Sequence, residues 1–384
     1  MSSINDPLND PHLKFKIGID LIPGIGSILA KKIIEFTGSP EEVFRSRKSL
    51  LENIPGIGKT LAGNIKGQKI LDKAEKEIEF ISKYQIRVVY YLDENYPWRL
   101  KHCPDSPVIL YIKGNADLNH PKVLSIVGTR SASSYGLEFC RNLIADLSNK
   151  GHDPLIISGL AYGIDICAHK SALKNKMKTV AALAHGLATI YPPPHRNVAE
   201  KIINSGALVT DFVSKSPPER GNFIKRNRII AGLADATIVI ESSIKGGAMI
   251  TADMANSYNR DVFALPGRVS DIRSQGCNNL IKTNKAALIE KVEDLEYILG
   301  WAPQEPPDKY KDISCAEVID EEEKAVVMLL AANGELSADH ISIETGLGIN
   351  KLSFILLNLE FKGHITSLPG KIYRLSNNFN SLTC

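Results

Sequence analysis

Three cationic side chains and one aromatic ring lie within six consecutive residues of this chain. Phe223 is followed by Lys225, Arg226 and Arg228, with Asn227 between the two arginines. Cations bind phosphates and a flat ring stacks on a base, so this combination suits a single-stranded nucleic acid. A helix that begins with surface lysine and arginine would contain the same residues. The pattern leaves both interpretations open.

A second candidate is the tripeptide Gly128-Thr129-Arg130, which directly follows an apolar run at residues 123–127. At the end of a strand, the glycine exposes backbone amides, the hydroxyl is a hydrogen-bond donor and the guanidinium is a bidentate donor. All three groups can bind one phosphate. The alternative is that Arg130 pairs with a neighbouring carboxylate.

Two further loops contain glycine where a ligand or a second chain segment can approach the backbone. Ser158 and Gly159 follow the apolar run at residues 155–157. Gly246 and Gly247 follow the run at residues 237–240 and lead into a helical segment. The second loop predicts backbone amides aimed at an anion, with an ordinary helix start as the alternative.

Asp165 and His169 lie four residues apart, so they would share one face of a helix. This spacing fits an acid/base pair, and it fits equally a structural pair at the start of the helix, which we favour.

The elements that must position these loops alternate between strand and helix patterns. Residues 135–150, for example, show apolar residues at helical spacing after the first apolar run. Alternation of this kind predicts an α/β fold, a Rossmann-like parallel sheet with helices on both faces. Ligands of such sheets bind at the carboxyl ends of the strands, where the four loops would meet. The predicted strands are residues 123–127, 155–157, 179–183, 237–240 and 261–265.

A short repeat precedes this region. Residues 21–30 are echoed by residues 53–62, and each copy reads as a helix end, a Gly-x-Gly turn and an apolar helix. This resembles a helix-hairpin-helix (SAM-like) motif, in which turn amides hold a backbone phosphate. The alternative is a small helical domain whose hairpins only pack on each other.

Proline-rich residues after position 300 predict a linker, and three helices with a terminal hairpin then predict a winged-helix domain. Its third helix, residues 350–361, carries few cations, so a protein-contact role is at least as well supported as DNA binding. The predicted domains are helical residues 1–82, α/β residues 83–299, a linker at 300–316 and winged-helix residues 317–384.

Bulk properties limit the function classes. The chain has 384 residues and a net charge of +3, so any basic site is local. Six cysteines form no CxxC pair, which makes zinc or dithiol chemistry improbable. No signal peptide or membrane span is visible, so we expect a cytoplasmic protein without a membrane, metal or cofactor partner.

Taken together, the motifs of the central region resemble the DprA/Smf family of bacterial DNA-processing proteins. The similarity covers the whole of that region, and the helical and winged-helix ends match members that carry both. The motifs are Ile126-Val-Gly-Thr-Arg130, Ser158-Gly-Leu-Ala161, Tyr191-Pro192, Phe223-x-Lys-Arg-Asn-Arg-Ile-Ile-Ala-Gly232, Val239-Ile-Glu241 and Val262-Phe-Ala-Leu-Pro-Gly267.

The resemblance implies an extended Rossmann fold that binds single-stranded DNA, forms a homodimer, protects incoming DNA and loads the RecA recombinase onto it during natural transformation and recombination. It assigns the DNA pocket to Arg130, Phe223, Lys225, Arg226 and Arg228. Two departures affect the details of the pocket: Tyr162 replaces an arginine that many members have, and residues 246–249 lack the usual serines.

Two other functions compete with this one. Related Rossmann enzymes hydrolyse nucleoside monophosphates with a glutamate on the helix after a Gly-Gly loop. Here Gly246 and Gly247 are followed by Asp253, with no glutamate through Tyr258, so we expect no enzyme activity. A structural adaptor would leave the basic run unexplained.

Overall fold

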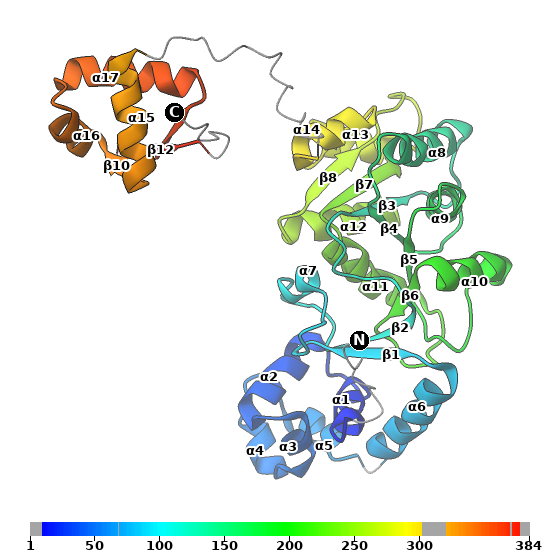
Figure 1. The fold of residues 1–384 in the computed structure, drawn as a ribbon. Helices are drawn as coiled ribbons and strands as arrows, with labels where there is room; N and C mark the ends of the chain where they lie inside the picture. The colour runs from blue at the N-terminus through cyan, green and yellow to red at the C-terminus, as the bar shows by residue number, and fades with distance from the viewer. Residues whose placement is uncertain (1–9, 68, 302–319, 369–370, 377–384) are drawn as a thin grey trace. The chain divides into compact units, whose positions relative to one another are not determined.

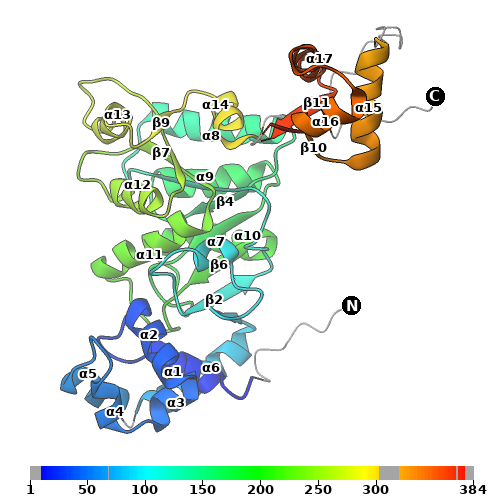
Figure 2. The ribbon, with the colours of Figure 1, turned by 90° about the vertical axis from the view of Figure 1, so that its left-hand side faces the viewer.

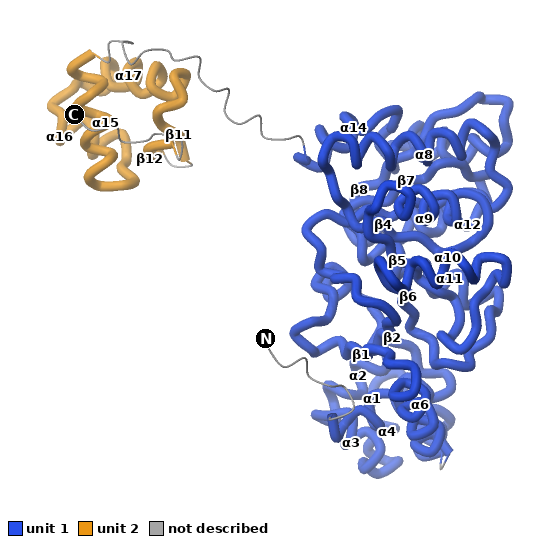
Figure 3. Tube along the Cα trace, turned by 45° about the vertical axis from the view of Figure 1, so that its right-hand side comes forward, with its two compact units in different colours: residues 1–302 blue, residues 303–384 orange. Residues whose placement is uncertain are grey.

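The computed structural model describes residues 10–67, 69–301, 320–368 and 371–376. Residues 1–302 form one compact unit and residues 303–384 form a second (Figure 3). The helical segment and the α/β segment both belong to the first unit. Residues 302–316 of the predicted linker lie outside the described residues, and the predicted domain boundaries stay predictions.

A nine-stranded sheet forms the centre of the first unit, within the described residues. The strand order is β1-β2-β6-β5-β4-β3-β7-β8-β9. The pairs from β6 to β9 are parallel, whereas β2 runs antiparallel to both of its neighbours. The strands are β1 (Arg87–Tyr90), β2 (Ile109–Gly114), β3 (Val123–Gly128), β4 (Leu155–Ser158), β5 (Thr179–Ala182), β6 (Ala207–Thr210), β7 (Ala236–Glu241), β8 (Asp261–Ala264) and β9 (Ala287–Leu288).

All five predicted strands are present, and β1, β2, β6 and β9 are additional. Together with the crossover helices they confirm the predicted α/β class. The chain moves outward from β3 to β6 and then returns to place β7 on the other side of β3. A sheet of this order has its binding crevice at the carboxyl ends of the strands where the direction reverses, here β3 and β7.

Helices cover both faces of the sheet (Figures 1 and 2). One face carries α8 (Ser134–Asn149), α9 (Ile164–Lys174), α10 (Arg196–Ser205) and α14 (Val292–Leu299). The other face carries α7 (Trp98–Lys101), α11 (Arg220–Leu233), α12 (Gly247–Ser257) and α13 (Gln275–Lys282).

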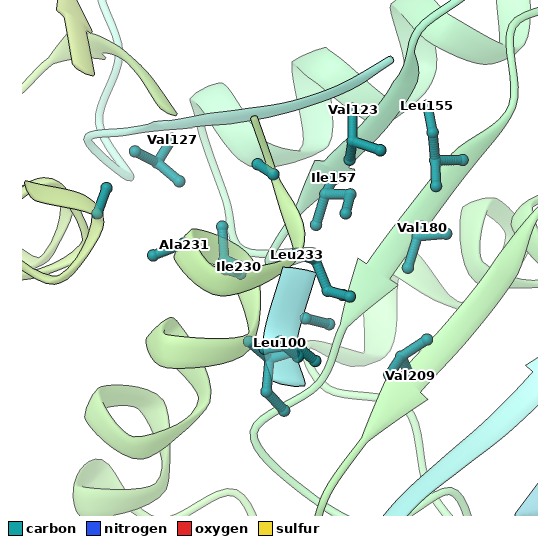
Figure 4. Packing of buried hydrophobic residues seen from close by; sticks show 14 of the residues in the cluster. Leu100, Val123, Val127, Leu155, Ile157, Val180, Val209, Ile230, Ala231 and Leu233 are labelled. Carbon is teal, nitrogen blue, oxygen red and sulfur yellow. The ribbon is translucent and has the colours of Figure 1, made fainter. Parts of the chain in front are cut away.

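The core on the α11 side shows why this helix is fixed in place. Ile230 and Leu233 of α11 pack against Val123, Leu155 and Val180 of the strands, and all five are buried (Figure 4). Each such side chain contributes roughly 1.5–3 kcal/mol when fully buried. The amino-terminal turns of α11, which carry the basic run, are thereby held at the carboxyl ends of the strands.

Six helices precede the sheet in the described part of the chain: α1 (Leu13–Asp20), α2 (Ser27–Thr37), α3 (Pro40–Arg45), α4 (Lys48–Glu52), α5 (Lys59–Ile65) and α6 (Ile70–Tyr84). Both repeat copies form the predicted hairpin, with Gly24 at φ +82° and Gly56 at φ +95° in the turns. A Cβ at Gly24 would lie 2.9 Å from Leu61, and one at Gly56 would lie 3.2 Å from Leu29. The two hairpins therefore pack reciprocally on each other.

The second unit has the predicted winged-helix elements. They are α15 (Glu321–Asn333), β10 (Leu336–Ser337), α16 (Ala338–Thr345), α17 (Ile349–Phe361), β11 (Ile365–Leu368) and β12 (Ile372–Leu375), with the strands in the antiparallel order β10-β12-β11. The predicted turn at Pro369 and Gly370 lies outside the described residues.

The third helix of this unit, α17, has few free cations. Lys351 pairs with Glu322 at 2.6 Å, and Lys362, just past the end of the helix, pairs with Glu323 at 2.8 Å. Exposed side chains of α17 include Phe354 and Phe361. The surface of this helix is therefore apolar where a DNA-reading helix would carry free charge.

Among the described residues of either unit, no helix combines the length and apolar character that a bilayer span requires.

Candidate nucleic-acid interface

Helix α11 splits the basic run into a buried part and an exposed part. Lys225 is exposed, whereas Arg226 is 4% exposed and Asn227 is 9% exposed. A helix of 3.6 residues per turn puts Arg226 and Asn227 on the side of Ile230, which faces the sheet. The basic run is therefore a helix segment with cations on both its buried and its exposed side.

The buried guanidinium of Arg226 holds two strand ends together. Its Nη1 atom donates to the carbonyl of Gly159 at 2.8 Å and to the carbonyl of Ala182, just after β4 and at the end of β5. A Cβ at Gly159 would lie 2.6 Å from both Arg226 Nη2 and an oxygen of Asp165. Arg226 therefore fills the space above Gly159, and neither residue is available to a ligand.

Asp165 is the acidic partner in this interior cluster. Its carboxylate accepts from the amide of Gly159 at 3.1 Å. Burial raises the pKa of Asp165, and Arg226 opposes that rise. Burial lowers the pKa of Arg226 to about 10, with Asp165 acting in the opposite direction, so the guanidinium stays charged at neutral pH. A buried cation that keeps its charge needs these partners.

Arg228 is also occupied by the protein. It donates to the carboxylate of Asp211, to the carbonyl of Asp105 and to the hydroxyl of Ser27 at 3.1 Å. Ser27 begins α2, so this residue ties the helical segment to the sheet. We expected Arg226, Asn227 and Arg228 to contact DNA; their position against the sheet gives them structural contacts instead.

The exposed part of the run lies in a group of rings and cations. The guanidinium carbon of Arg130 is 5.2 Å from the ring centre of half-buried Phe223. The ring of exposed Tyr191 meets Phe223 edge-on, with the ring centres 6.0 Å apart. We call these three residues, together with Lys225, which is exposed on the same turn of α11, the aromatic–basic cluster. Tyr191 was noted in the sequence only as part of a Tyr-Pro motif and was not predicted as a site residue.

Hydrogen bonds across the crevice place Arg130. The amide of Thr129 donates to the carbonyl of Glu241 at 2.7 Å, which joins the ends of β3 and β7. The buried carboxylate of Glu241 accepts from the amide of Ser133 at 2.8 Å and from its hydroxyl. Ser133 in turn accepts from the amide of Gly136 and so caps α8. The loop between β3 and α8 is therefore rigidly positioned.

Gly163 supports the same loop from the other side. It has φ +74°, and a Cβ there would lie 2.2 Å from the carbonyl oxygen of Thr129. Only glycine fits this close approach.

The remaining predicted site residues mostly support the loops. Ser158 is buried and donates to the carbonyl of Ile126 at 2.6 Å, and Gly128 packs against Ile164. Gly247 is exposed at the start of α12, and Gly246 precedes it as the helix cap. Gly247 is thus exposed at the surface, and the anion contact predicted for this loop stays a prediction.

Asp165 and His169 do not form the predicted pair. Thr179 donates its hydroxyl proton to the carbonyl of Ile156 at 2.8 Å, so it accepts from Nδ1 of His169 at 2.7 Å. Burial, with Arg226 and His195 nearby, lowers the pKa of His169 to about 3. The imidazole is therefore neutral, wholly buried and unsuited to exchange protons with a ligand.

Comparisons with known proteins identify the family of the chain. Residues 87–299 match the family model for DNA recombination-mediator protein A, and residues 302–371 match that for the DprA winged helix domain. The chain belongs to the DprA/Smf family. Protein Smf of Synechocystis sp. is 34% identical over 388 residues, covering 92% of this chain and 96% of that protein.

Other members of the family support the same assignment. DNA processing protein DprA of Streptococcus pneumoniae is 40% identical over 205 residues, which cover 53% of this chain and 71% of that protein. An X-ray structure of the pneumococcal protein has a TM-score of 0.61 at 31% identity, covering 74% of this chain and 97% of that one. A structure that describes the single-stranded DNA binding mode of the Helicobacter pylori protein has a TM-score of 0.51 at 29% identity, covering 57% and 98%.

The two neighbours Lys225 and Arg226 should respond differently to alanine substitution. Arg226→Ala leaves Asp165 and two carbonyls without their cation, so we expect a loss of about 3 kcal/mol in the free energy of unfolding. Lys225→Ala should stay within about 0.5 kcal/mol of the natural protein. Urea unfolding followed by circular dichroism measures both, and equal midpoints would contradict the structural role of Arg226.

The pKa of His169 gives the protein a defined pH dependence. The imidazole titrates near 6.5 when unfolded and about 3 when folded. Below pH 6.5 the unfolded chain therefore binds a proton that the folded chain does not, and stability falls as pH falls. Compared with His169→Gln, the natural protein should lose up to about 1.4 kcal/mol more per pH unit below that point.

Urea unfolding at several pH values from about 7 down to about 5 measures this difference. His102→Gln, at an exposed histidine just past the end of α7, is the matched control. Parallel stability curves for the natural protein and His169→Gln would show that His169 is protonated in the folded state.

Proposed function

We propose that this protein binds single-stranded DNA at the aromatic–basic cluster. The observation that carries the proposal is the Arg130 guanidinium over the ring of Phe223, with Tyr191 at its edge, beside the crevice at β3 and β7. The single-stranded DNA binding described for the Helicobacter pylori relative supports it.

The geometry supplies both contacts that a single strand needs. Arg130 and Lys225 offer charge to two phosphates, and Phe223 and Tyr191 offer ring surfaces to unpaired bases. A ring stacks on any base, so we expect little sequence preference. In a duplex the bases are already stacked on one another, so single strands should bind more tightly.

The wider proposal is that the protein protects incoming DNA, loads RecA onto it and works as a homodimer in the cytoplasm during transformation and recombination. Membership of the DprA/Smf family supports it. For the dimer, we propose the sheet edge at β9 and α14. Leu288, Tyr297 and Ile298 are exposed there, at 42%, 87% and 41%.

We also propose that the protein is not an enzyme. Glu241, a carboxylate at the crevice, is 2% exposed and accepts two hydrogen bonds from Ser133, which assigns it to the loop structure. His169 is buried and bonded to Thr179. A hydrolysis assay with nucleoside monophosphates tests this directly, and turnover that Glu241→Gln abolishes would overturn it.

Substitutions in the cluster should separate ionic from stacking contacts. Arg130→Ala and Lys225→Ala should each reduce the slope of log affinity against log salt by about 0.7, since each removes one phosphate contact. Phe223→Ala should cost roughly 1–3 kcal/mol of binding with the slope nearly unchanged. Fluorescence anisotropy with a labelled oligothymidine across salt concentrations measures all three.

Lys201→Ala, at an exposed lysine of α10, is the control and should bind like the natural protein. Equal affinity for duplex and single strand at every salt concentration would sink the proposal, and so would normal binding by both Arg130→Ala and Phe223→Ala.

The dimer and the RecA role should depend on different residues. Tyr297→Asp combined with Leu288→Asp should halve the particle mass measured by light scattering, because charge opposes burial of an apolar face. The control Ile28→Asp changes an exposed apolar residue on α2 and should leave the mass unchanged.

The RecA role should depend on the DNA site. Arg130→Ala should keep the dimer but slow RecA filament growth on protein-coated single strands. A monomeric natural protein would refute the proposed dimer. A natural protein without effect on RecA filament growth would refute the proposed loading role.

A further inference from the structure

A groove of about 600 Å³ runs between α8 and α9, on the opposite face of the sheet from α11. Its walls include Arg141 from α8 and Lys170 and Lys174 from α9, and its lining contains no aspartate or glutamate. Leu137 and Ile166 contribute apolar surface. The groove is therefore cationic along its sides, with apolar surface between the charges.

The three cations have no carboxylate partner among the described residues. Arg141, Lys170 and Lys174 are exposed, and none of them takes part in an ion pair among the described residues. Lys170 and Lys174 are four residues apart on one helix, a spacing at which like charges repel. An anion in the groove would relieve that repulsion.

The groove begins beside the aromatic–basic cluster. Gly163 lines its near end, and a Cβ on that glycine would lie 2.2 Å from the carbonyl oxygen of Thr129 and 2.8 Å from that of Arg130. From the start of α9, Lys170 and Lys174 lie about 9 Å and about 15 Å farther along the helix axis, at 1.5 Å per residue. The cations thus continue in one direction from Arg130.

We propose that this groove is the path by which a bound single strand leaves the aromatic–basic cluster. Phosphates of the next nucleotides lie on Arg141, Lys170 and Lys174, and their sugars and bases lie against Leu137 and Ile166. This inference rests on the proposed function, and it extends the DNA site along α8 and α9. Because the contacts are to the backbone, the path accepts any sequence.

The floor of the groove contains its own chemical probe. Cys167 lines the groove and is 8% exposed, whereas Cys140 beside it is fully buried. A hydrogen bond from Cys140, together with Ser171 and Arg141, lowers the pKa of Cys167 against the effect of burial. A lowered pKa favours the thiolate, which is the form that reacts with alkylating agents, so alkylation reports on whether the groove is covered.

The first experiment compares short and long strands on the full chain. The variant R141A/K170A/K174A should bind a short oligothymidine of about six nucleotides normally, because such a strand fills only the cluster. For a strand of about 20 nucleotides its salt slope should fall by about 2, for three lost phosphate contacts at about 0.7 each. The control K73A/K76A/K201A removes three exposed lysines from α6 and α10 and should leave both strands unaffected.

Light scattering must show the same particle mass for each protein, so that a change of oligomeric state does not imitate the effect. A groove variant that binds long strands with normal affinity and slope overturns the exit path. Equal weakening for short and long strands also overturns it, since the groove would then be part of the primary site.

The second experiment measures alkylation of Cys167 by iodoacetamide in the natural protein, with Cys140 as the buried reference. At a long-strand concentration ten times Kd, the reaction should slow about tenfold, because only the unoccupied fraction reacts. The short strand at equal saturation should give little protection. An unchanged rate with the long strand overturns the proposal, and so does equal protection by thymidine monophosphate, which would indicate a small-ligand site.

The experiments distinguish failure of the proposed DNA site from failure of the proposed exit path. If Arg130→Ala leaves short-strand binding unchanged, the proposed DNA site itself is wrong. If Arg130→Ala abolishes that binding while the groove variant and Cys167 show no long-strand effect, the site stands and only the exit path is lost.

Discussion

The buried charge of Arg226 is the constraint on which the site depends. A guanidinium in the interior is unfavourable unless its donors are satisfied and its charge is balanced. Here two strand-end carbonyls accept from Arg226, and Asp165 supplies the counter-charge. Those partners come from the ends of β4 and β5 and from the start of α9. By binding them, Arg226 sets the rotation of α11 about its own axis. Lys225 and Phe223 reach the surface of the crevice because their neighbour is anchored beneath it.

The molecule thus divides its cations between two tasks. Arg99, which pairs with Asp235, and Arg226 and Arg228 join segments that are distant in sequence, and each is held by carboxylates or carbonyls. Arg130 and Lys225 are exposed and remain for a ligand. This division explains how a chain with a net charge of only +3 can still present a local basic site. The proposed site lies at the crevice of the sheet, where β3 and β7 end.

Sequence alone predicted five of the parallel strands, since apolar runs that alternate with helical spacing have few other structures available. It missed the parallel strands β6 and β9, and it missed β1 and β2, which are antiparallel and lack that alternation. It also treated the dense charge around Arg226 as surface, although Phe223, Arg226 and Ile230 share helical spacing and so predict a common face. The contact of Tyr191 with Phe223 follows from tertiary folding. In the sequence, Tyr191 was marked only by the Tyr-Pro motif, which does not predict that contact. The bond from His169 to Thr179 had no signal in the sequence.

The close packing around the β3–α8 loop has a genetic consequence. A Cβ at Gly163 would meet the carbonyl of Thr129 at 2.2 Å, and one at Gly136 would meet the Glu241 carboxylate at 2.7 Å. A single added methyl at either position displaces the segment that carries Arg130, although neither glycine contributes a side chain to any ligand. Added atoms at these glycines should therefore impair the site as effectively as lost charge does. A contact map of a DNA complex would overlook them.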